Sequence, residues 1–141
     1  MVHPKPRYVV SLPFLSSILT LISQCAASLT PLIPLLASIV ENRPCVRVRV
    51  HIFYTRATGV TFDGMYLPQG ITLLPGRPNL GNLLGEAITN TMSAGGTNGL
   101  FVGVCGPVAL ARTTARVVKE VDTHSRTAVG GVELHEETFG W

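Results

Sequence analysis

The chain has 141 residues, of which 46% are hydrophobic and 13% charged, and its formal net charge is +3 at pH 7. This length suits one domain with a real core, and the apolar composition excludes a disordered chain. The basic residues are scattered rather than gathered in a block, which argues against nucleic-acid binding. Three cysteines, Cys25, Cys45 and Cys105, form no metal-ligand spacing, so a reducing compartment is the simpler inference.

The N-terminal part is the most apolar region of the sequence. Met1–Arg7 is polar and suits a frayed leader, whereas Tyr8–Val40 contains no Asp, Glu, Lys or Arg. Three interpretations remain open for this segment. The first is two short buried helices, Phe14–Gln24 and Leu32–Glu41. The second is a signal peptide with a cleavage site of small residues near residue 27. The third is a membrane span interrupted by prolines.

Hydrophobic periodicity predicts alternating strands and helices in the rest of the chain. The expected elements are, in chain order, a strand over Val46–Tyr54, a loop over Gly59–Gly70, a short strand over Ile71–Leu74, a helix capped by Asn79 and ending near Ser93, a strand over Leu100–Val104, a helix over Val108–Val121, a polar turn over Asp122–Gly131 and a last strand over Val132–Thr138. Such alternation favours an α/β fold, in which helices cover the faces of a parallel sheet.

Three short motifs follow one another along this second part. The strand that ends in Thr55 comes first, the sequence Gly76-Arg77-Pro78 precedes a helix, and Cys105-Gly106-Pro107 joins a strand to another helix. The chain then closes on a strand with Phe139 and Trp141 at its end. Over roughly residues 45–141 this order resembles the nicotinamide-binding domain of the ferric reductase and NADPH oxidase family, within the ferredoxin-reductase-like group.

The resemblance implies a fold, a cofactor and a function. The fold is a partial doubly wound parallel sheet of the ferredoxin-reductase type, with residues 45–141 as the C-terminal part of an NAD(P)H-binding domain and residues 1–44 as an apolar helical segment. In the intact family this domain delivers hydride from NADPH, or NADH, to FAD, at the cytoplasmic face of a membrane. The FAD-binding and haem-bearing membrane domains are the partners, and neither is part of this chain.

The resemblance also implies site residues. Cys105 would lie beside the nicotinamide and Phe139 would stack on the flavin. The two side chains would therefore lie at the same opening of the molecule. Arg77 would bind a phosphate, with Arg56 as a weaker candidate on the adenosine side, and Trp141 would extend the aromatic cover. The remaining cofactor-binding positions are Thr55, Gly76, Pro78, Gly106 and Pro107.

Physical arguments support these positions, and each position also has a simpler explanation. A small thiol permits close approach of a ring, a glycine admits a ligand near the backbone, and Pro107 starts a helix whose amino end attracts phosphate. However, Cys105 is also compatible with an ordinary buried position in a strand, and Arg77 with an exposed position beside a turn. Phe139 is also compatible with a core position that holds the last strand in place. His135-Glu136-Glu137 lacks the second histidine of a helical zinc motif, so no metal site is expected.

The sequence departs from the family at its N-terminal end. No glycine occurs before Gly59, so the glycine-rich pyrophosphate loop and the strand before it are expected to be missing. The isolated chain is therefore expected to have no reductase activity and to be cytosolic or membrane-associated. Two alternatives stay open: a non-enzymatic membrane-tethered or secreted protein, and a degenerate interaction module.

Overall fold

The computed structural model describes residues 15–23, 31–42, 46–55, 66–95 and 99–139. Its elements are β1 (Leu15–Ser23), α1 (Ile33–Glu41), β2 (Val46–Tyr54), β3 (Ile71–Pro75), α2 (Leu80–Ser93), β4 (Leu100–Gly106), α3 (Val108–Lys119), α4 (Thr123–Ala128) and β5 (Val132–Thr138). The first three strands form a parallel sheet in the order β1-β2-β3, and β4 pairs in parallel with β5. The chain is thus an α/β protein with parallel strands.

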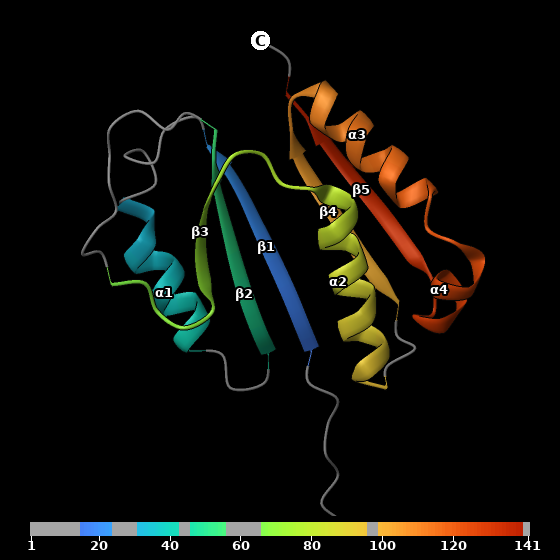
Figure 1. The fold of residues 1–141 in the computed structure, drawn as a ribbon, viewed down its shortest axis with the longest axis horizontal. Coiled ribbons are helices and arrows are strands. Elements are labelled where there is room, and N and C mark those ends of the chain that lie inside the picture. The colour runs from blue at the N-terminus through green and yellow to red at the C-terminus, as the bar shows by residue number, and fades with distance from the viewer. Residues whose placement is uncertain (1–14, 24–30, 43–45, 56–65, 96–98, 140–141) are drawn as a thin grey trace, which may run out of the picture.

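The two sheets lie next to each other. Figure 1 shows the strands side by side in the spatial order β3, β2, β1, β4, β5, all running toward the same edge. No backbone ladder joins β1 to β4, so the five strands form two hydrogen-bonded sheets rather than one. We call the edge at which all five strands end the carboxyl edge.

The helix expected over Phe14–Gln24 is wrong, because this segment contains β1. Leu15–Ser23 pairs in parallel with Val46–Tyr54 along its whole length. A short apolar run does not distinguish a buried strand from a buried helix by periodicity alone, and the β-branched side chains at alternate positions 18, 20 and 22 favour a strand. The expectation of a sheet without its first strand is corrected as well, since β1 precedes β2 and lies beside it.

The second helix expected in the apolar region is present as α1. Pro34 lies in its first turn, where a missing backbone N–H costs nothing, and Ile33 and Leu36 are buried. Leu36 packs against Val50 and Ile52 of β2 and against Ile71 of β3. Among the described residues no helix has the length and hydropathy that a membrane span requires.

A second core lies under α2 and α3. The N-cap of α2 is confirmed as Asn79, whose side chain accepts a hydrogen bond of 3.1 Å from the backbone N–H of Asn82. Leu84 and Ile88 of α2 are buried against Val118 of α3, and Val129 completes this cluster. Leu100, Val102, Val132 and Leu134 contribute from β4 and β5.

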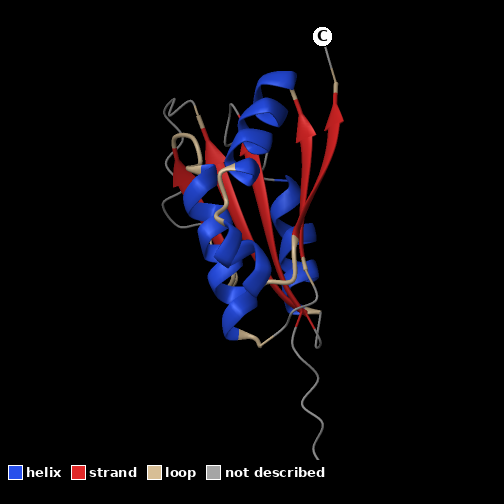
Figure 2. Ribbon diagram, turned by 90° about the vertical axis from the view of Figure 1, so that its right-hand side faces the viewer, coloured by secondary structure: helices blue, strands red, loops and turns tan. Residues whose placement is uncertain are grey.

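The helices cover opposite faces of the strands. Successive side chains of a strand point to opposite faces, and on β2 Val50 contacts α1 whereas Arg49 forms an ion pair with Glu86 of α2. Therefore α1 lies on one face, and α2, with α3 packed against it, lies on the other. Figure 2 shows helices on both sides of the strands.

The polar turn expected over Asp122–Gly131 is wrong, because it contains the six-residue helix α4. Asp122 is the N-cap of α4, and its carboxylate accepts a hydrogen bond of 2.9 Å from the backbone N–H of Ser125. This hydrogen bonding to Ser125 lowers the pKa of Asp122 below its ordinary value. The cap was visible in the sequence as an Asp three residues before a Ser, but the short polar helix lacks an apolar face that periodicity detects.

The other expected elements are confirmed, with small changes at their ends. The strand Val46–Tyr54 and the last strand Val132–Thr138 have the expected bounds. β3 extends to Pro75 and β4 to Gly106, whereas α3 ends at Lys119. Of the loop expected over Gly59–Gly70, residues 59–65 lie outside the described residues, and residues 66–70 belong to no helix or strand.

Candidate functional site

The candidate residues gather at the carboxyl edge in two groups. On one side, the backbone N–H of Gly76 donates to the carbonyl of Tyr54 at 2.9 Å, which joins the end of β3 to the end of β2. On the other side, the N–H of Phe139 donates to the carbonyl of Gly106 at 3.3 Å, which joins the end of β5 to the end of β4. The end of β1 lies between the two groups (Figure 1).

The first group contains Thr55, Gly76, Arg77 and Pro78. Gly76 has φ of +92°, a left-handed conformation that favours glycine, and it turns the chain out of β3. Arg77 is exposed, and Pro78 is half-buried. Figure 1 shows the segment between β3 and α2 crossing the carboxyl edge toward β4. Arg56, the other candidate cation, lies outside the described residues.

The second group contains Cys105, Gly106 and Pro107. Cys105 is exposed and is not in a disulfide. Gly106 is buried, and a Cβ at this position would lie 3.0 Å from Cδ2 of Leu110, so the glycine permits close packing of α3 on the strand. Pro107 is the N-cap of α3, with φ of −59°, and the helix begins at the next residue.

The aromatic terminus lies beside this second group. Cys105 pairs with Glu137 across β4 and β5, so these two side chains share one face of the sheet. Phe139 follows two residues later and is 45% exposed. The structure brings the ends of β4 and β5 together, but Phe139 does not line the cavity described below. Trp141 lies outside the described residues.

The charges at the carboxyl edge are mixed, because the carboxylates of Glu136 and Glu137 at the end of β5 oppose the positive groups there. The first turns of α2 and α3 carry no acidic residue, so the partial positive charge at each helix amino end is not neutralised there. Asn79 already occupies one N–H of α2, whereas α3 has no side-chain cap. Arg77 supplies a full positive charge near the same edge.

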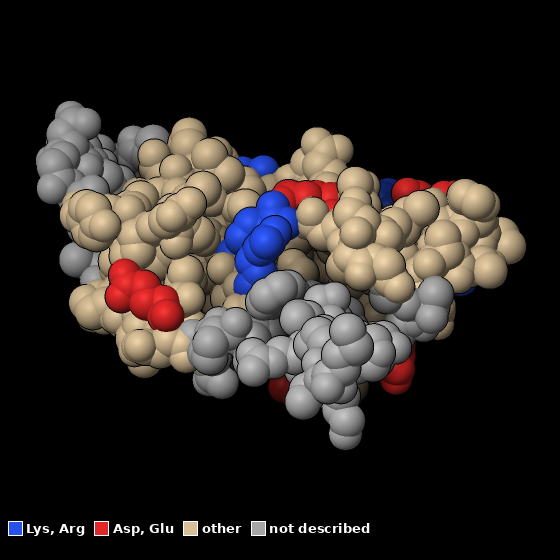
Figure 3. All heavy atoms as spheres, turned by 90° about the horizontal axis from the view of Figure 1, so that it is seen from below, with Lys and Arg blue, Asp and Glu red and all other residues tan. Residues whose placement is uncertain are grey.

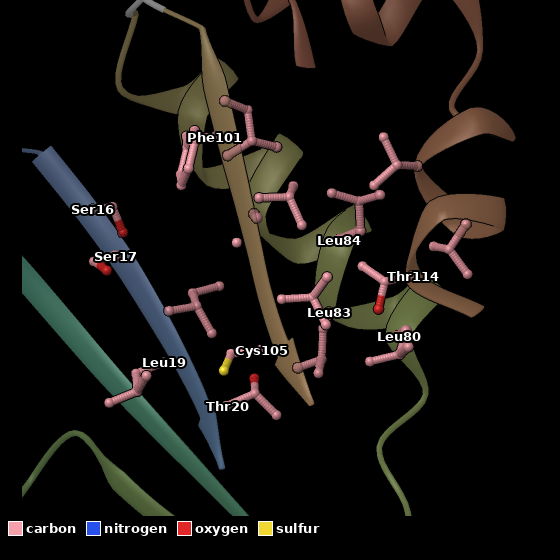
Figure 4. A pocket seen from close by; sticks show the side chains of 18 of the residues that line it. Ser16, Ser17, Leu19, Thr20, Leu80, Leu83, Leu84, Phe101, Cys105 and Thr114 are labelled. Atoms are coloured by element: carbon pink, nitrogen blue, oxygen red, sulfur yellow. The ribbon is translucent and has the colours of Figure 1, made fainter. Parts of the chain in front are cut away.

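A cavity of about 310 Å³ separates β1 from β4, and we call it the β1–β4 cavity. Its walls come from β1, α2, β4 and α3, and Figure 4 shows the side chains of Thr20 and Cys105 pointing into it. None of its lining residues carries a charge. Sequence reasoning missed this cavity because it assigned the segment of β1 to a helix, although Ser16 and Thr20 are a sign of a strand with a polar side.

The opposite edge carries charges of both signs. Figure 3, seen from below, shows a group of basic side chains directly beside an acidic group, with uncharged surface around them. Within β2 rather than at its end, Arg49 forms an ion pair with Glu86 of α2, and Nε of Arg49 is buried without a hydrogen-bond partner. Nδ1 of His51 lies 2.7 Å from Oγ1 of Thr72, while its Nε2 is also buried without a partner.

A metal site has no support in the part of the chain that the structure describes. No group of three or more His, Cys, Asp or Glu side chains there has the arrangement of a metal site. His135 and Glu137 lie 3.6 Å apart on β5, and the His135 ring stacks on Phe101 with 6.3 Å between centroids. These contacts account for His135 as a surface residue of β5.

Comparisons with protein-family models, curated proteins and solved structures gave no match to this chain.

Proposed function

We propose that this chain is the NAD(P)H-binding portion of an oxidoreductase of the ferric-chelate reductase type. One observation carries the proposal: the spatial order of the strands reverses between β1 and β4, and Cys105 lies at the carboxyl end of β4 next to that point. In open α/β sheets, ligands bind outside the carboxyl ends of the strands at such a reversal.

The arrangement of the helices supports the finer fold assignment. The chain first winds one way, with α1 on one face of the strands, and then the other way, with α2 and α3 on the opposite face. This is the pattern of a doubly wound domain. The strand order β3-β2-β1-β4-β5 is that of the first five strands of such dinucleotide-binding sheets. We therefore propose a doubly wound arrangement of the two sheets, in which β1 and β4 are the adjacent strands but share no ladder.

The residues at the carboxyl edge fit a nicotinamide better than they fit a pyrophosphate. Cys105 is exposed, uncharged in its thiol form and next to a cavity, which suits a flat ring. For phosphate, the described residues offer Arg77 and the uncapped amino end of α3. Residues 24–30, which follow β1, contain no glycine to bring the backbone close to a phosphate.

The roles of the site residues follow from these positions. When bound, NADPH supplies a hydride, which the FAD of the intact enzyme accepts. Cys105 would exclude water beside the nicotinamide ring, and Phe139 would cover the flavin from the end of β5. Thr55, Gly76 and Pro78 would shape the nucleotide side, Gly106 and Pro107 would position α3, and Arg56 and Trp141 would add a charge and an aromatic surface.

The alternative of a non-enzymatic membrane-tethered or secreted protein finds less support than the nucleotide site. A signal peptide ending near residue 27 would remove β1, which pairs with β2 along nine residues. A degenerate interaction module would fold without binding a nucleotide, so a binding measurement separates it from the proposed function.

A titration with NADPH tests the proposal. We expect saturable binding, followed through the fluorescence of Trp141, and a loss of about tenfold or more in affinity in Arg77→Ala, since a charge-assisted hydrogen bond contributes about 1.5–3 kcal/mol. Arg112→Ala removes an exposed arginine of α3 and is the matched control, with unchanged affinity. Absence of binding at millimolar NADPH, or equal affinities in both variants, would refute the proposal.

A second measurement tests the catalytic limit. Hydride transfer needs a flavin held against the nicotinamide, and the residues assigned above belong only to the nicotinamide-binding part, so this chain alone is expected not to reduce a ferric chelate with NADPH. Reduction of the chelate by the purified chain alone would contradict the assignment of this chain to one part of a larger enzyme.

A further inference from the structure

The β1–β4 cavity shares Cys105 with the proposed nicotinamide position, but most of its lining lies away from the carboxyl edge and is not used by the nucleotide proposal. It lies between the two sheets, and its lining extends along β1 from Ser16 to Ile22 and along β4 from Leu100 to Cys105. This range covers most of both strands rather than their carboxyl ends alone. The volume of about 310 Å³ is at the lower end of the range for small-molecule pockets.

The lining is unfavourable for a charged ligand. Leucine, isoleucine, valine, alanine and phenylalanine side chains form most of the walls, and the polar groups are hydroxyls, one amide and one thiol. An ion placed among such groups would lose part of its hydration without gaining an opposite charge, which is unfavourable. The lining therefore suits an uncharged molecule better than an ion.

One buried polar atom in the lining lacks a partner. Nδ2 of Asn90, on α2, is buried and makes no hydrogen bond. A buried amide N–H without an acceptor is costly, and the great majority of such groups in proteins are paired. By contrast, the hydroxyls of Thr91 and Thr114 in the same lining already donate to the helix carbonyls of Ala87 and Leu110. Asn90 thus supplies a buried donor in the lining that has no acceptor.

We propose that the β1–β4 cavity binds a neutral, planar, mostly apolar molecule with a carbonyl or ring-nitrogen acceptor, and that Nδ2 of Asn90 donates a hydrogen bond to that acceptor. The space between two adjacent strands, closed on one side by α2 and α3, favours a flat shape (Figure 4). Cys105 is the one residue that this site shares with the nucleotide proposal, and the donor Asn90 has no part in that proposal, so the site is tested through Asn90 and Ala87 rather than through Arg77.

Binding of prodan to the full chain tests this proposal. Prodan is a neutral, planar naphthalene ketone whose emission shifts to the blue and brightens when it leaves water. We expect saturable binding with a blue shift. Anilinonaphthalene sulfonate, which is similar in size but anionic, is expected to bind at least about tenfold more weakly because of the uncharged walls. Equal or tighter binding of the anion, which is typical of a molten globule, would overturn the proposal.

Two substitutions locate the site. Ala87→Leu adds an isopropyl group inside the cavity and is expected to reduce prodan affinity by about tenfold or more, because the added group fills space that the ligand needs. Ala109→Leu makes the same change at an exposed position of α3 that does not line the cavity, and its affinity should equal that of the parent chain. Equal affinities in these two variants would overturn the location.

The amide is tested separately. Asn90→Leu keeps the approximate volume but removes the donor, and it is expected to weaken prodan by about three- to tenfold, the range of one net hydrogen bond. Asn82→Leu, at an exposed position of the same helix, is the control. Unchanged affinity in Asn90→Leu, with circular dichroism and thermal unfolding like those of the parent chain, would overturn the role of the amide.

Discussion

Val50 offers the sharpest test of the layer formed by α1 and the first sheet. Its side chain has no exposed surface, and it lies in β2 between its pairing partners Leu19 of β1 and Ile71 of β3, beneath Leu36 of α1. Val50→Ala removes two buried methyl groups. At about 0.8 kcal/mol for each buried carbon, with about 1 kcal/mol for the cavity that remains, the free energy of unfolding should fall by about 2–3 kcal/mol.

The assay is urea unfolding followed by circular dichroism, supported by the thermal midpoint. For a chain of this size the expected loss corresponds to a decrease of about 6–12 °C in Tm. Val108→Ala is the matched control, because Val108 is 44% exposed at the start of α3 and should change stability by less than about 0.5 kcal/mol. Equal effects of the two substitutions would refute the packing of α1 on β2 described above.

Three further predictions address β1, the cap of α4 and the thiol. Leu21→Asp places a charge against the core under α1 and should unfold the domain. Leu35→Asp is the control, because this position is 59% exposed, and it should leave the domain folded. Equal solubility and circular dichroism of both variants would contradict the assignment of β1 to the core. The folded-state pKa of Asp122 is lowered, so its contribution to stability is present above the unfolded pKa of about 3.9 and is lost as pH falls through the folded pKa. The urea midpoints of the parent chain and of Asp122→Ala should therefore differ at pH 7 and converge in acid. A constant difference down to pH 2 would be inconsistent with this cap. Exposed Cys105 should react with N-ethylmaleimide in the native chain, as peptide mass mapping measures, and saturating NADPH should slow this reaction; labelling at an unchanged rate in bound protein would argue against a nicotinamide beside the thiol.

Periodicity and capping signals were sufficient for the second part of the fold. The alternation in Val46–Tyr54 predicted β2, and Asn79 before an apolar helical stripe predicted α2. These signals are local, because the side chains that define them lie within one element. The bounds of β5 were correct for the same reason.

The sequence was insufficient where pairing between distant segments decides the structure. β1 is a strand because β2 lies beside it, and an apolar run such as Ile18–Ile22 is equally compatible with a buried helix until that neighbour is known. The β1–β4 cavity depends on the relative placement of two sheets, which no single segment encodes. The residues at the carboxyl edge, by contrast, could be placed from the ends of their strands, although their chemical roles remain proposals.

The position of α2 gives the two sheets a common mechanical support. This helix contacts both β1 and β4, and its Glu86 is tied to β2 through Arg49. A tilt of α2 would therefore widen or narrow the space between the sheets. Glu86 does not line the cavity. Its substitution is nevertheless expected to alter the rates at which a small molecule enters and leaves the β1–β4 cavity, because the ion pair with Arg49 helps to fix the position of α2.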